Sequence, residues 1–157
     1  MAISIDTSQA LRRPSDLLHL VQQVVAALPE DEAHWVEWKA SLPLDKAEGW
    51  FSTARQVLGF ANRHHDRAAR FVGGLGYLIV GAEPGKSDGI APVDVAKLDD
   101  WLRPYRGSAG PVWSPTYLEV DDTSVLVVLV EPPAWGDPIY PLRKSYQPAK
   151  GPGSDKE

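Results

Sequence analysis

The first residues whose types and spacing suit chemistry form a short acidic segment. Glu32 and Glu37 are five positions apart, and Lys39 follows Glu37 by two positions. Because side chains alternate in direction along a strand, Glu37 and Lys39 share one face if this segment is a strand. Glu32 falls at the entrance of that strand, where the backbone can turn its carboxylate back toward Glu37.

Two carboxylates that converge in this way predict a site for a divalent metal ion. Mg²⁺ and Mn²⁺ prefer oxygen ligands, and a lysine beside them can hold a phosphate or stabilise the charge that develops during its cleavage. The alternative is a solvated strand edge on which Glu37 and Lys39 form an ordinary ion pair. The spacing alone favours this alternative, and both interpretations stay open at this point.

A third carboxylate follows the short apolar run 77–80, which is expected to be a buried strand. Glu83 lies just past the carboxyl end of that run, where site residues often lie, and is a candidate third ligand. The same loop contains Gly-Lys-Ser, which suggests a phosphate-binding loop. Three residues rather than the required four separate Gly81 from Gly85, and no clear helix start follows. A tight polar loop is therefore favoured over nucleotide binding.

A basic segment provides candidates for contacts with phosphate groups. Between positions 55 and 70 the chain carries four arginines and a single acidic residue. The arginines are Arg55, Arg63, Arg67 and Arg70. On a continuous helix they predict a basic stripe that faces phosphates, although arginines in the last turns of a helix also interact favourably with its dipole. His64 and His65 are adjacent, so they should point apart on that helix and form a poor metal pair.

Hydrophobic periodicity predicts the elements that must position these residues. Apolar residues recur at helical spacing after Pro14 and again after Asp45. The second of these helices is expected to continue through the basic segment until Gly73 and Gly74 end it. In chain order we expect a helix over 15–28, a strand over 34–38, a helix over 45–70, a strand over 77–80, a helix over 93–102, and strands over 113–120 and 124–130 joined by a turn at 121–123.

The composition of the whole chain narrows the classes of function. Its 157 residues suffice for one domain, and the lack of cysteine excludes a disulfide scaffold, a thiolate zinc site and a cysteine nucleophile, which favours a cytoplasmic location. No stretch approaches the roughly 18 apolar residues of a membrane span, so no membrane partner is expected. The net charge of −5 requires any nucleic acid to meet a local basic patch. We expect a flexible arm over 1–13, a folded domain over 14–145 and a flexible tail over 146–157.

Taken together, these segments resemble the Schlafen AlbA-like domain. That family usually carries Glu-Phe-Lys, then Phe-Ala-Asn, then Gly-Gly before an apolar strand that ends in Gly-Val, followed by an acidic residue and a later glycine. The similarity extends over about residues 28–142, and the order of the motifs is more specific than any one of them. The corresponding residues are Glu32, Glu37-Trp38-Lys39, Phe60-Ala61-Asn62, Gly73-Gly74, Tyr77-Leu78-Ile79-Val80-Gly81, Glu83 and Gly89.

The resemblance implies an α+β fold in which a mixed, mostly antiparallel sheet packs with about three helices. Some Schlafen members are metal-dependent endoribonucleases that cut transfer and ribosomal RNA with three carboxylates. In this chain Glu32, Glu37 and Glu83 match those carboxylates, Lys39 would assist them, and Mg²⁺ or Mn²⁺ would be the cofactor. The contacts with RNA or DNA would come from Arg55, Arg63, Arg67 and Arg70.

The family also suggests functions other than cleavage, because many bacterial members are described as transcriptional regulators or ATP-binding proteins. A module that binds nucleic acid or a protein, including a second copy of itself, is the first alternative, and an ATP-binding regulator that uses 81–87 is the second. The stretch 63–72 is an insertion relative to the short form of the family. A final strand with an arginine-glycine pair is missing before Glu157, which suggests a fragment or the N-terminal part of a longer regulator.

Overall fold

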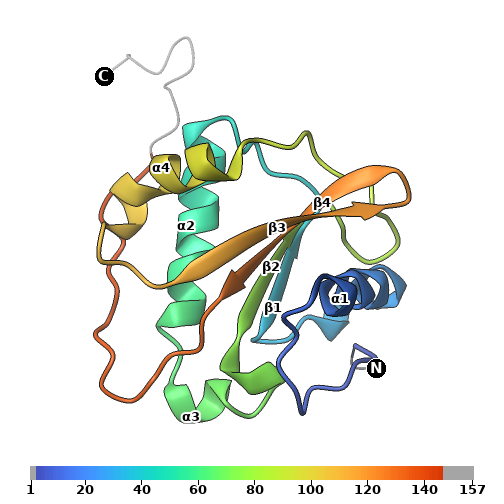
Figure 1. Cartoon of the computed structure of the whole chain (residues 1–157), viewed down its shortest axis with the longest axis horizontal. Helices are drawn as coiled ribbons and strands as arrows, with labels where there is room; N and C mark the ends of the chain where they lie inside the picture. Colours follow the sequence, from blue (N-terminus) through green and yellow to red (C-terminus); the bar gives the residue numbers. More distant parts are fainter. Residues whose placement is uncertain (1–2, 147–157) are drawn as a thin grey trace, which may run out of the picture.

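The structure, a computed structural model, describes residues 3–146 and contains one four-stranded sheet (Figure 1). The strands lie in the order β1-β2-β4-β3, with β1 parallel to β2 and the other two pairs antiparallel. The elements are α1 (Pro14–Ala26), η1 (Pro29–Asp31), β1 (Val36–Lys39), α2 (Ala47–Ala61), α3 (His65–Ala68), η2 (Val72–Gly74), β2 (Gly76–Val80), α4 (Val95–Arg106), β3 (Trp113–Val120) and β4 (Thr123–Val130). The expected α+β fold with a mixed, mostly antiparallel sheet is confirmed, with four α-helices in the described part of the chain.

The two central strands, β2 and β4, are almost completely buried because helices cover both faces of the sheet (Figure 1). Alternate residues of a strand point to opposite faces. Tyr77 and Ile79 of β2 therefore pack in the cluster that contains α1, while Leu78 and Val80 pack in the cluster that contains α2 and α4. This double burial explains why β2 is a continuous apolar run in the sequence rather than an alternating one.

The edge strand β1 takes the direction of its side chains from its register with β2. Glu37 lies opposite Leu78, and Trp38 lies opposite Ile79. Residues that lie directly opposite each other in a sheet share a face. Glu37 therefore faces the side of α2, as does Lys39 two positions later, and Trp38 faces the side of α1.

The segment before α1, for which the sequence predicts a loose arm, packs against the sheet in the structure. Ile3 and Leu11 are buried in the same cluster as α1. The Tyr77 hydroxyl accepts a hydrogen bond from the Leu11 backbone N–H (2.9 Å) and donates one to the Leu11 carbonyl (2.8 Å). Burial raises the pKa of Tyr77 to about 12. The Arg12 guanidinium also donates two hydrogen bonds to the Glu131 carboxylate, so contacts along this segment tie it to the fold.

The basic segment is not a continuation of α2, so the predicted helix over 45–70 is wrong in its second half. The first helix ends at Ala61, and a short second one begins at His65. Between them His64 has an extended backbone (φ −64°, ψ 130°), and its ring nitrogen Nδ1 accepts a hydrogen bond from the Asp66 N–H. A side chain that satisfies the first N–H groups of a helix favours a new start at that point.

The hairpin of β3 and β4 has the turn that the sequence predicts near 121–123. Asp121 and Asp122 both have positive φ (49° and 64°), as the type I′ turn of a two-residue hairpin requires. In the described part of the chain, no helix has both the length and the apolar character needed to cross a membrane. The tail predicted over 146–157 lies, except for its first residue, outside the described residues.

Replacement of Tyr77 by phenylalanine should destabilise the fold, because the Leu11 N–H and carbonyl lose their partner in a buried place. A buried group left without its hydrogen bond costs about 1–3 kcal/mol, and urea denaturation of Tyr77→Phe should show a loss of that size in the free energy of unfolding. Tyr140→Phe is the matched control, since the Tyr140 hydroxyl makes no hydrogen bond to the described residues. Equal losses in the two variants would contradict the role given to Tyr77.

Candidate functional site

Two of the predicted carboxylates and the predicted lysine come together at β1. The chain leaves η1 and enters the sheet so that the Glu32 carboxyl hydrogen-bonds with Glu37. The Lys39 ammonium lies 3.3 Å from the Glu37 carboxylate, measured from Nζ to Oε1. Partial burial of the carboxyl, the hydrogen bond with Glu37 and the charge of Glu37 raise the pKa of Glu32 to about 7, and Lys39 opposes this rise. Glu32 is therefore partly protonated near neutral pH.

Glu83 does not join this pair, although the sequence predicts it as the third carboxylate. Because β1 and β2 are parallel, Glu32 before β1 and Glu83 after β2 belong to opposite ends of the strand pair. Glu83 instead contacts Lys86, through two backbone hydrogen bonds and an ion pair of 3.4 Å. Within residues 3–146, no group of three or more histidine, aspartate and glutamate side chains is placed to hold a metal ion. The predicted group of three carboxylates is thus not formed there.

The carboxylates that do meet fit a divalent metal ion poorly. Mg²⁺ and Mn²⁺ take about six oxygen ligands and keep only some of them as water. Glu32 is partly protonated near neutral pH, and Glu37 is already paired with the Lys39 ammonium. No chemical step can be assigned to a metal ion at this place, and Mg²⁺ or Mn²⁺ stays a prediction from the sequence.

The loop 81–87 is a tight turn closed by its own contacts, not a cradle for phosphate. The Lys86 ammonium contacts the carboxylates of Glu83 (3.4 Å) and Asp88 (3.7 Å). The next helix begins only at Val95, so no helix N-terminus lies directly behind the loop. These contacts give the ATP-binding alternative no support.

A pocket of about 400 Å³ gathers three of the four predicted arginines. We call it the arginine pocket; it is lined by His34, Arg63, His64, Arg67, Arg70 and Phe71. One of these residues precedes β1, and the others lie between α2 and β2. Since the two strands are parallel, the segments that precede them meet at the same edge of the sheet. The strand pairing therefore brings the lining residues of this pocket together.

Arg63 is the fixed member of the arginine pocket. Its side chain is half-buried, and Nε donates to the Phe60 carbonyl at 2.9 Å while Nη2 donates to the Gly74 carbonyl at 2.7 Å. The third nitrogen, Nη1, is buried and has no hydrogen-bond partner within residues 3–146. Burial lowers the pKa of Arg63, yet a guanidinium stays charged at physiological pH. The charge of this held cation suits an anionic ligand in the pocket.

His34 and Phe71 are residues of this pocket that the sequence interpretation missed. Their rings lie edge to face, with centroids 5.3 Å apart and planes at 72°. Partial burial and the charges of the three pocket arginines lower the pKa of His34, against the effect of a hydrogen bond with the Arg67 backbone. His34 is therefore neutral at physiological pH, and the positive charge around it comes from the pocket arginines. The one available signal was the place of Phe71 directly after the basic segment.

Arg55 lies apart from the arginine pocket. It is carried by α2, and its guanidinium lies over the Phe51 ring at 5.5 Å from the centroid. The predicted stripe needs one helix through the whole basic segment, whereas α2 ends at Ala61. The helical spacing of the arginines is consequently lost, and only those after the break line the pocket.

Comparison of the chain with family models, with curated proteins and with solved structures finds no match in any of the three. The resemblance to the Schlafen AlbA-like domain accordingly stays an expectation from the sequence motifs. A fold alone does not decide a function, because one fold serves many activities. The function has to be argued from the arginine pocket and from the pair of Glu32 and Glu37.

Glu32→Gln should stabilise the protein at neutral and alkaline pH. The pKa of Glu32 is about 7 in the fold, above its ordinary value of 4.5. The folded state therefore holds the proton more tightly than the unfolded chain, and a rise in pH between about 4.5 and 7 removes stability. Glutamine resembles the protonated form at every pH. Because Glu32 is exposed to solvent, the gain should not exceed about 1 kcal/mol.

Thermal unfolding between about pH 5 and pH 8 measures this effect. The advantage of Glu32→Gln over the unaltered protein should grow up to about pH 7 and then level off. Glu30→Gln is the control, because Glu30 is an exposed glutamate of the same turn η1. If the curves for the two variants run parallel over the whole pH range, the contact between Glu32 and Glu37 does not act as described.

Proposed function

We propose that this protein binds nucleic acid, with phosphate groups held in the arginine pocket and without cleavage of the strand. The observation that carries the proposal is the convergence of Arg63, Arg67 and Arg70 in one pocket of a protein with a net charge of −5. Contacts between arginines and phosphates supply much of the affinity for nucleic acid, whatever its sequence. A local basic pocket is what an acidic protein needs for such a partner.

The arrangement of charge within the pocket supports a chain of phosphates rather than a single anion. Arg63 is half-buried and held by two backbone carbonyls, whereas Arg67 and Arg70 are exposed. A backbone with phosphates in series can contact the held arginine and the exposed ones at the same time. The acidic residue of this segment, Asp66, contacts the His65 ring at 3.2 Å.

The aromatic side chains favour a nucleic acid over inorganic phosphate. The Phe71 side chain lines the pocket beside His34 and is partly exposed. Aromatic rings next to basic residues are the usual means of contacting bases and sugars in RNA and in single strands. The proposal also agrees with the role that the resemblance to the Schlafen AlbA-like domain implies.

The double substitution Arg67→Ala and Arg70→Ala should weaken binding of a labelled transfer RNA by roughly tenfold or more at low salt. It removes two cations that contact phosphates, so the slope of log affinity against log salt should fall by about 2. Fluorescence anisotropy over a series of salt concentrations measures both quantities. Both side chains are exposed, and the fold should be unaffected.

The matched control is the double substitution Arg13→Ala and Arg55→Ala. Both of these arginines are exposed and lie outside the pocket, and the change in net charge is the same. If only the overall charge of the protein mattered, the two double variants would lose affinity equally. An equal loss, or no binding by the unaltered protein, contradicts the proposal.

The endoribonuclease that the sequence motifs imply is the second candidate, and one observation favours acid–base chemistry at Glu32 rather than a metal site there. Glu32, whose pKa is about 7, lies two positions before His34 of the arginine pocket. A carboxyl with a pKa near the working pH is suited to general acid or base catalysis of phosphodiester cleavage. Glu37 and Lys39 beside it could orient the carboxyl and stabilise charge.

Incubation of the purified protein with transfer RNA separates the two candidates. We expect bound but intact RNA with Mn²⁺, with Mg²⁺ and with a chelator. Cleavage that requires Mn²⁺ and disappears in Glu37→Gln, but not in the control Glu30→Gln, would instead favour the endoribonuclease. Gel electrophoresis of labelled RNA gives the answer without any assumption about the cleavage position.

A further inference from the structure

The segment after β4 leaves two large apolar side chains almost fully exposed. Trp135 and Ile139 are each 84% exposed, whereas most tryptophans of the chain are buried or half-buried. A single exposed apolar residue is common, but two close together on one loop favour a binding surface. We call residues 132–140 the Trp135 loop.

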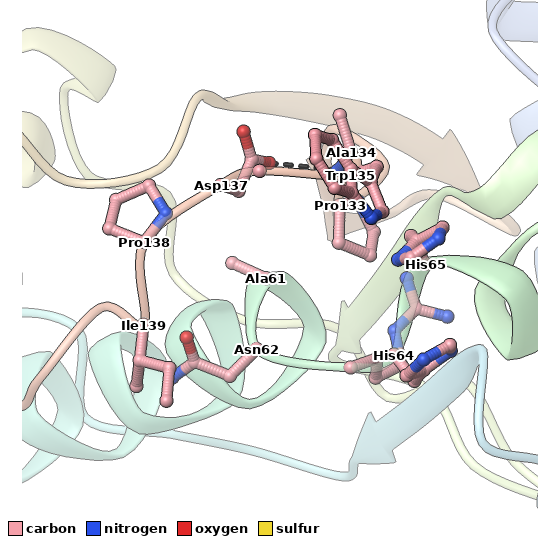
Figure 2. A pocket seen from close by; sticks show the side chains of 12 residues that line it. Ala61, Asn62, His64, His65, Pro133, Ala134, Trp135, Asp137, Pro138 and Ile139 are labelled. Atoms are coloured by element: carbon pink, nitrogen blue, oxygen red, sulfur yellow. Dashed lines mark hydrogen bonds between the residues drawn. The ribbon is translucent and has the colours of Figure 1, made fainter.

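This loop is held in place by hydrogen bonds at its end, Tyr140, and within its own turn. The Asn62 side chain, just past the end of α2, donates to the Tyr140 carbonyl and accepts from the Tyr140 N–H, both at 2.8 Å. Asp137 closes a turn in which its carboxylate accepts from the Ala134 N–H at 2.8 Å, the contact drawn as a dashed line in Figure 2. Trp135 lies within that turn and is presented to solvent by an ordered backbone.

The Trp135 loop forms one wall of a second pocket, of about 260 Å³. The other wall is the stretch 61–65 (Figure 2), so Arg63 and His64 line both this pocket and the arginine pocket. The rings of His64 and His65 stack, with centroids 4.7 Å apart and planes at 21°. They do not point apart as the sequence predicts, because His64 precedes the helix instead of lying within it. The two histidine rings and the Arg63 guanidinium thus belong to the wall that faces the Trp135 loop.

We infer that the Trp135 loop stacks an unpaired base of a single-stranded nucleic acid whose neighbouring phosphates occupy the arginine pocket. This inference rests on the proposed function and names the form of nucleic acid that the site takes. Bases within a duplex are stacked on each other and offer no free face, whereas the bases of a single strand stack readily on tryptophan. The two pockets are neighbours, because Arg63 and His64 line both of them.

The alternative occupant of the exposed indole is a protein surface, and charge argues against it. The pocket lined by the Trp135 loop shares Arg63 and His64 with a pocket that holds three arginines, in a chain whose net charge is −5. A ligand that contacts the Trp135 loop and the arginine pocket together needs flat apolar groups joined by regularly spaced negative charges. A single strand of RNA or DNA has this composition throughout its length.

Three labelled ligands of equal length test the inference: a single-stranded oligonucleotide, the same strand without bases, and its duplex. Trp135→Ala should lower the affinity for the single strand by roughly tenfold or more and leave the affinity for the abasic strand unchanged. Trp135→Phe should retain most of the affinity, because it keeps a flat aromatic ring. Leu28→Ala, at an exposed apolar residue that lines neither pocket, should have no effect.

Tryptophan fluorescence gives a second readout. Binding of the single strand should quench emission in the unaltered protein but not in Trp135→Phe, although this variant still binds. An unchanged affinity of Trp135→Ala for the single strand, or an equal loss for the abasic strand, overturns the inference. If Arg67→Ala with Arg70→Ala still weakens binding in that case, the proposed function stands without it. If the unaltered protein binds none of the three ligands, both fail.

Discussion

Parallel pairing of β1 with β2, with Val36 opposite Tyr77, places the amino ends of both strands at one edge of the sheet. The segments before these strands carry His34 on one side and the arginines with Phe71 on the other, and they meet in the arginine pocket. The loop with Glu83 follows β2 and so lies at the other end of the pair. One pairing therefore unites the basic residues and separates the third carboxylate from the first two.

Both faces of β2 are buried, so the polar side chains of the candidate sites lie beyond the ends of this strand and on its neighbour β1. Backbone and side-chain contacts hold the irregular segments that lie beyond the ends of the strands. Arg63 satisfies the carbonyls of Phe60 and Gly74, and Asn62 holds the backbone of Tyr140. Contacts that stabilise the fold thus also place the arginine pocket beside the Trp135 loop. The stretch 63–72 supplies most of the residues that line the arginine pocket.

The two candidate sites of the protein differ in what their electrostatics permit. The pair of Glu32 and Glu37 holds a proton near neutral pH and has Lys39 as its counter-ion, so it presents little net charge to a ligand. The arginine pocket keeps its charge, and that charge is strong enough to help suppress protonation of His34. Long-range attraction of a polyanion to an acidic protein depends on such a local field. Binding is accordingly better supported than cleavage.

The sequence by itself determined most of the helices and strands, among them the buried strand β2, the hairpin at Asp121 and Asp122, and the arginines as the basic feature of the chain, because these depend on local periodicity and residue type. Only the tertiary structure decided the break after Ala61, the separation of Glu83 from Glu37 and the exposure of Trp135. The separation of Glu83 follows from the pairing of β1 with β2, and the loop with Trp135 is held by Asn62, so both depend on segments far apart in the chain. The break after Ala61 also has a local cause, the hydrogen bond from the Asp66 N–H to the His64 ring. Local patterns carry no information on which segments will meet, since strand pairing and packing are decided by the whole fold.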